Sequence, residues 1–195
     1  MHSNRMGFGD WINRKRHNRG FGIQSPSAFF FITQVLKERL PYYSYKELDR
    51  YKGKSRRLAK ELFRITNYIH PTNCISIASD RATVAMKAAR PAAPAYSLGA
   101  ECIEEFAGIM AECGKLGMLY IGESPQRTAI LEKALQHTDN HSAIVIEGIG
   151  KNRAARSLWQ QVIEDPRTIV TYDMHSYGLL LFDNEKKKQN YKLKR

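Results

Sequence analysis

The sequence predicts an α/β domain with a mostly parallel sheet, helices on both faces, a closing antiparallel β-hairpin and an N-terminal helical extension. Between residues 74 and 163, short apolar runs alternate four times with helical patterns. Parallel strands need such long crossover connections, so this alternation indicates a parallel sheet. Two further apolar runs, 168–173 and 177–182, are separated by only three residues, which predicts a hairpin.

The N-terminal extension is expected to contain two helices. A hydroxyl cap followed by proline at the first helical position places one helix start at Ser25-Pro26-Ser27. We expect this helix to end near Pro41. Apolar residues at three- and four-residue steps predict a second helix from about Ser55 to Tyr68. Residues 1–22 have no apolar period and are expected to be loosely attached.

The core elements follow in chain order. Strands are expected at 74–78, 95–98, 117–122, 143–147, 168–173 and 177–182, with helices at 81–89, 101–113, 125–136 and 154–163. Ser79 or Asp80 is suited to cap the first of these helices, and Gly114 to end the second. The continuous apolar run at 143–147 is typical of a central parallel strand.

The chain has 195 residues, enough for one domain with a full core and too few for two ordinary ones. We expect residues 1–70 to form a basic helical extension packed on the core, and residues 71–195 to form the core itself. The net charge of +12 is unevenly spread. Counted along the sequence, residues 1–70 carry +10, residues 71–182 carry −2 and residues 183–195 carry +4. Basic ends favour an acidic partner, whereas the simpler interpretation is solvated surface and a solubilising tail.

Cysteine and histidine spacing indicates neither a disulfide framework nor a metal site. Cys74, Cys102 and Cys113 form no CxxC pair, so we expect buried small side chains. His137 and His141 are four residues apart, but a turn is predicted between them. No apolar run approaches the length of a membrane span, and no signal-peptide region is evident, so we expect a cytoplasmic protein.

Four segments carry a resemblance that goes beyond the order of elements. They are Arg19–Pro26, Leu40–Tyr43, Leu62–Tyr68 and Asp173–Phe182. These segments resemble the N-terminal part and the closing hairpin of a bacterial family that is similar to class I S-adenosylmethionine (SAM)-dependent methyltransferases. The resemblance implies a Rossmann-like sheet, SAM as the cofactor, and methyl transfer to an acceptor that the sequence does not identify.

The cofactor loop departs from the pattern of that family. There the first strand ends in an acid and a glycine-rich turn, because only glycine lets the backbone approach the cofactor so closely. Here residues 76–82 contain no glycine, and Arg81 stands where the resemblance places the methionine part of SAM. The helix at 101–113 leads directly to a strand resembling the family's fourth, so we expect the third strand to be missing.

Four residues are candidates for the cofactor pocket. Ser79 and Asp80 precede a helix whose free N–H groups attract anions, with plain capping as the alternative. Glu101 follows the second strand, where the family carries an acid that binds ribose. Glu123 is the acid nearest to the family's aspartate beside the methyl-transfer site. Glu147 replaces an acidic pair that binds metal in one branch, and a single acid predicts no metal site. No catalytic base is assigned.

Two functions follow from these observations. One is a SAM-dependent methyltransferase-like protein, with or without retained catalysis. The other is a non-enzymatic binding or interaction module on the same fold, which contacts nucleic acid or another acidic partner through its basic ends. Tyr42, Tyr43 and Tyr45, followed by basic residues, offer stacking surfaces for nucleic acid. We favour a packing hinge for these tyrosines, because no recognised nucleic-acid motif is present.

Overall fold

The computed structural model describes residues 23–193. Its strands are β1 (Cys74–Ile77), β2 (Ala95–Leu98), β3 (Met118–Ile121), β4 (Ala143–Glu147), β5 (Val170–Asp173), β6 (Tyr177–Leu181) and β7 (Gln189–Lys192). Its helices are α2 (Pro26–Phe30), the π-helix η1 (Phe31–Leu36), the 3-10 helix η2 (Tyr43–Leu48), α3 (Gly53–Ile69), α4 (Asp80–Ala89), α5 (Ile103–Cys113), α6 (Arg127–Leu135) and α7 (Arg153–Glu164).

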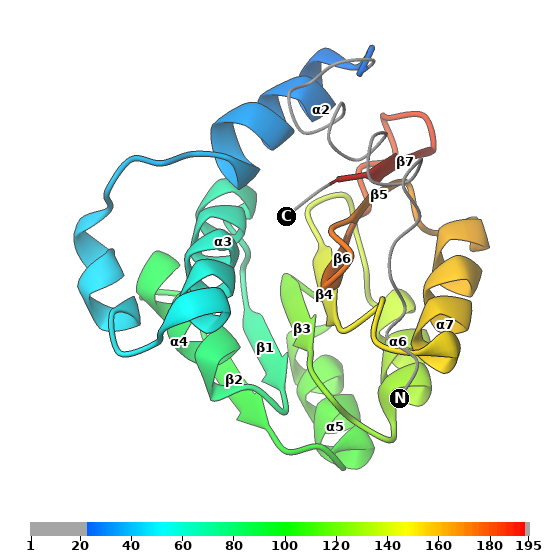
Figure 1. Ribbon diagram of the computed structural model, residues 1–195. Coiled ribbons are helices and arrows are strands. Elements are labelled where there is room, and N and C mark those ends of the chain that lie inside the picture. The colour runs from blue at the N-terminus through cyan, green and yellow to red at the C-terminus, as the bar shows by residue number, and fades with distance from the viewer. Residues whose placement is uncertain (1–22, 194–195) are drawn as a thin grey trace.

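The strands form one sheet with helices on both sides (Figure 1). The strand order is β2-β1-β3-β4-β6-β5-β7. Strand β6 is antiparallel to both of its neighbours, β4 and β5, and the other neighbouring pairs are parallel. This arrangement confirms the predicted α/β class, the mostly parallel sheet and the closing hairpin.

Two apolar clusters lie on opposite faces of the sheet, because successive side chains of a strand point to opposite sides. One cluster joins the sheet to η1, α3 and α4, with Phe31, Leu62 and Met86 among its buried members. The other joins the sheet to α5, α6 and α7, and includes Phe106 and Trp159. The helices before β1 thus share a continuous core with the sheet. No helix among residues 23–193 is long and apolar enough to cross a membrane.

Helix α5 is followed directly by strand β3, as expected from the short stretch after this helix. Among the described strands, β2 has β1 as its one neighbour. The chain passes from α5 directly to β3, which lies on the other side of β1. The change of direction between β2 and β3 creates a switch point at the carboxyl ends of β1 and β3.

Two segments differ from the sequence prediction. The first helix ends at Leu36 rather than near Pro41, after its hydrogen bonds change to the wider π pattern, in which Lys37 N donates to Ile32 O at 3.1 Å. The basic tail, interpreted as solvated, contains β7. Its Tyr191 ring stacks on Tyr172 at 5.3 Å between centroids, and this packing stabilises an added strand at the sheet edge. Residues 1–22, expected to be loosely attached, lie outside the described part of the chain.

Candidate functional site

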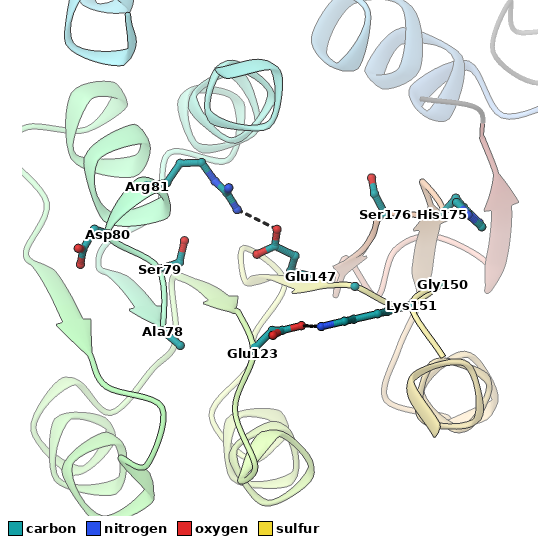
Figure 2. Close-up of a pocket in the computed structure, with 11 residues that line it drawn as sticks. Ala78, Ser79, Asp80, Arg81, Glu123, Glu147, Gly150, Lys151, His175 and Ser176 are labelled. Atoms are coloured by element: carbon teal, nitrogen blue, oxygen red, sulfur yellow. Dashed lines mark hydrogen bonds and ion pairs between the residues drawn. The ribbon is translucent and has the colours of Figure 1, made fainter. Parts of the chain in front are cut away.

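A pocket of about 610 Å³ lies at the carboxyl edge of the sheet, beside the switch point. Open α/β sheets bind their ligands at this position. The loop after β1 (78–81), Glu123 after β3, the loop that begins at Glu147, and the hairpin turn at 175–176 line the pocket (Figure 2). Its volume is in the range of pockets for small ligands.

Arg81 ties four elements together at this pocket. Its Nη2 donates to Glu147 Oε1 at 2.8 Å and to the Tyr120 hydroxyl at 3.1 Å, and its Nη1 donates to Ser55 Oγ at 3.1 Å. Tyr120 in turn donates to Glu147 Oε2 at 2.5 Å. Figure 2 shows the Arg81 side chain reaching from α4 to the carboxylate at the end of β4. The result is a charged bridge between α3, α4, β3 and β4.

Burial and the neighbouring side chains together shift the pKa values in this bridge. Burial raises the pKa of Tyr120, and the neighbouring Glu147 raises it further. The phenol therefore stays protonated and donates a hydrogen bond to Glu147. Burial alone lowers the pKa of Arg81, but Tyr120 and Glu147 outweigh that effect and raise it, so the guanidinium stays charged. The side chains of Arg81 and Glu147 are 20% and 32% exposed, which leaves the pair partly solvated. Within residues 23–193, Arg81 Nε is buried and has no hydrogen-bond partner.

The loop after β1 turns directly into a helix. Ala78 has a left-handed backbone, with φ of 54°, although it is not glycine. Ser79 is the helix cap, since its Oγ accepts from Ala82 N at 3.3 Å. The glycine that allows a close approach follows β3 instead, because a Cβ on Gly122 would lie 2.8 Å from Ile77 O. That approach brings the loop after β3 against the loop after β1.

The loop after β2 is bonded to the loop after β3. Ser124 Oγ donates to Ala100 O at 2.5 Å. Gln126 Oε1 accepts from the backbone N–H groups of Cys102 and of the following residue, at 2.7 and 3.0 Å. Glu101 lies within this bonded loop, is exposed, and is not among the residues that line the pocket.

The mouth of the pocket carries a second ion pair. Lys151 and Glu123 are bonded to each other, with side chains 62% and 68% exposed (Figure 2). The hydrogen bond from Lys151 lowers the pKa of Glu123. Behind them, a Cβ on Gly150 would lie 2.5 Å from His175 O, so the loop after β4 packs directly on the hairpin turn.

The structure brings three of the four predicted site residues together. Ser79, Asp80 and Glu123 line the same pocket, whereas Glu101 lies outside its lining. A cofactor-binding role for these residues stays a prediction. Among residues 23–193, no three histidine, cysteine, aspartate or glutamate side chains are grouped so that they could hold a metal ion.

Sequence reasoning missed three residues that shape the pocket. Tyr120 lies in an otherwise apolar strand, where a hydroxyl signals a buried hydrogen bond. Lys151 and His175 lie in turns after β4 and β5. Their position at the carboxyl edge was the available signal, because loops at that edge meet in space.

Comparison with known proteins supports the fold. No protein-family model matches the chain, and no curated protein matches its sequence. Among solved structures, the SAH-bound Podospora anserina methyltransferase PaMTH1 is similar, with a TM-score of 0.55 and 9% sequence identity. The match covers 83% of this chain and 97% of that chain. At this identity the likeness shows the fold alone, so the chain has a methyltransferase-like fold.

Proposed function

We propose that this protein is a binding module on a methyltransferase-like fold and that it does not deliver a methyl group from SAM. The observation that carries the proposal is the Arg81 bridge to Glu147 and Tyr120. The resemblance places the methionine part of SAM at the position of this bridge. SAM therefore does not fit the residues present unless the bridge opens.

Electrostatics adds to the steric argument. The methionine part of SAM carries a sulfonium and an ammonium group against one carboxylate, so its net charge is positive. The charge of Arg81 is already neutralised by Glu147, so the bridge offers no unpaired charge to this part of SAM. Opening the bridge would also remove the hydrogen bonds that Arg81 donates to Glu147 and Tyr120.

The ribose side of the site gives a second argument. In the family that the chain resembles, an acid after the second strand binds the ribose hydroxyls. The acid available here, Glu101, lies outside the pocket lining, and its loop is bonded to the loop after β3 through Ser124 and Gln126. In both halves of a SAM site, the residues are thus bonded to other parts of the same chain.

A SAM-dependent methyltransferase is the second candidate. It is favoured by a pocket at the switch point and by the likeness to a methyltransferase that is SAH-bound. In that case Ser79, Asp80 and Glu123 are the residues placed to contact the cofactor, and the Arg81 bridge must open on binding.

Calorimetric titration with SAM and with S-adenosylhomocysteine separates the two candidates. We expect neither heat nor a thermal shift at millimolar ligand. Micromolar binding that Asp80→Ala or Glu123→Ala weakens would overturn the proposal and establish the second candidate. Glu164→Ala is the matched control, because this exposed acid ends α7 at the opposite edge of the sheet.

A further inference from the structure

We infer that a surface on η2 and the start of α3 binds single-stranded nucleic acid. The residues assigned to this surface, here called the basic aromatic face, follow one another from η2 to the start of α3 and are all exposed: Tyr43, Lys46, Arg50, Lys52 and Arg57. The inference rests on the proposed role as a binding module and names the chemistry of the partner.

Tyr42, Tyr43 and Tyr45 have different surroundings. Tyr42 and Tyr45 pack on Phe63 of α3, with ring centroids 5.1 and 5.2 Å apart. Tyr43 is 85% exposed, and Lys46 Nζ lies 4.8 Å from its ring centroid. An exposed ring beside a cation provides a stacking surface for a base and a contact for its phosphate.

The charge of the region matches a polyanion. Residues 37–60 contain nine lysines and arginines against three acids. Two of these acids are engaged within the protein: Glu38 accepts from Tyr42 at 2.6 Å, and Asp49 pairs with Arg56 at 2.6 Å. The remaining positive charge attracts a polyanion over a range of about 8–10 Å at physiological salt.

The face is held rigidly on the core. Buried Arg64 donates to Val35 O at 2.7 Å, to Leu36 O at 2.9 Å and to the Tyr45 hydroxyl at 3.1 Å. Leu48, at the end of η2, is fully buried. A preformed surface loses little conformational entropy on binding, so its contacts contribute to affinity.

The face also lies next to the carboxyl-edge pocket. Ser55, in the first turn of α3, accepts the hydrogen bond from Arg81 that links this helix to the pocket. In Figure 1, the segment between α2 and α3 lies at the left of the molecule, beside α4. A flexible strand that stacks on Tyr43 and follows the start of α3 is therefore led toward the pocket. A duplex keeps its bases stacked internally, so this ring favours a single strand.

The test is fluorescence anisotropy with labelled oligo-dT and oligo-U, using the full chain. We expect binding that weakens as salt rises, with a log–log slope of about −0.7 for each phosphate contact. Tyr43→Ala should weaken binding about tenfold through lost stacking, and Tyr43→Phe should retain it. Lys52→Glu and Arg57→Glu should weaken binding further. These residues are exposed, so the variants are expected to fold, which circular dichroism checks.

Lys187→Glu is the matched control, because this exposed lysine lies in the other basic end of the chain. Absence of binding at low salt overturns the inference, as does Tyr43→Ala binding like wild type or Lys187→Glu weakening binding as much as Lys52→Glu. Cosedimentation with phosphatidylserine vesicles in place of oligonucleotide binding overturns it as well. If the protein binds neither oligonucleotides nor SAM, this inference is wrong and the proposed function stands. If the protein binds SAM, the proposed function is wrong.

Discussion

The amino ends and the carboxyl ends of the parallel strands are held by contacts of different chemistry. At the amino ends, buried Asn73 donates through Nδ2 to Lys115 O at 2.9 Å and accepts at Oδ1 from Gly117 N at 2.9 Å. These bonds are neutral and involve the backbone. At the carboxyl ends, the bridge from Arg81 to Glu147 is charged, made of side chains, and partly exposed.

This difference in chemistry distinguishes the amino edge, which is part of the structural framework, from the carboxyl edge, which carries the candidate site. A buried backbone group that loses its partner bears the full desolvation penalty, so the amino edge has no alternative arrangement at low cost. A partly solvated ion pair exchanges its partner for water or for a ligand with much less loss. A ligand that rearranges the sheet therefore does so at lower cost at the carboxyl edge, where it must still break the Arg81 bridge.

The largest effect is expected for Gly117→Ala at the amino edge. The added Cβ would lie 2.5 Å from Asn73 O and 2.8 Å from Asn73 N, and backbone atoms cannot move aside. We expect a loss of about 3 kcal/mol in the free energy of unfolding, measured by urea denaturation. Gly108→Ala is the control, because nothing lies within 4 Å of its new Cβ in α5. Equal losses of stability in both variants would contradict the close packing of Gly117 on Asn73 at the amino edge.

Breaking the bridge should cost less. Glu147→Ala removes the acceptor of Arg81 and Tyr120, and we expect a loss of about 1–2 kcal/mol because water partly replaces it. Urea denaturation measures the loss, with Glu164→Ala as the exposed control at the other edge. A loss as large as that of Gly117→Ala would mean that the bridge stabilises the fold as much as the contacts at the amino edge do.

Relieving backbone strain in the loop after β1 should stabilise the protein. Ala78 is exposed and has φ of 54°, so Ala78→Gly removes a left-handed penalty without removing packing. We expect a gain of about 1 kcal/mol, seen as a higher thermal midpoint. Ala107→Gly, inside α5, should lose about as much, because glycine disfavours helix. Loss of stability in both variants would show that the loop is not strained.

The framework was predictable because its signals are local. The apolar run at 143–147 forms β4 as expected, and Gly114 ends α5 with φ of 69°. Burial on both faces makes such strands continuously apolar, so one sequence is enough to place them. Strand β7 was not predicted, because its stability depends on Tyr191 packing on Tyr172, which is distant in the sequence.

The site was only partly predictable because its contacts join distant residues. The position of Arg81 at the cofactor loop was visible in the sequence, but its partner Glu147 is 66 residues away. Glu101 illustrates the opposite case. Its order in the chain matches the family's acid, yet a shift of one or two residues beyond β2 carries it out of the pocket lining. Side-chain direction changes with each residue in a loop, so order alone does not place it.

The smallest effect on stability is expected for the ion pair at the mouth of the pocket. Lys151 and Glu123 are both mostly exposed, so Lys151→Ala should leave the urea midpoint unchanged. The variant should nevertheless raise the pKa of Glu123 toward its ordinary value, because the hydrogen bond from Lys151 lowers it. Protonation of Glu123 then begins at higher pH than in wild type, which NMR titration of its carboxyl carbon measures. An unchanged pKa would mean that the pair does not form in solution, and a lowered midpoint would mean that this contact belongs to the framework.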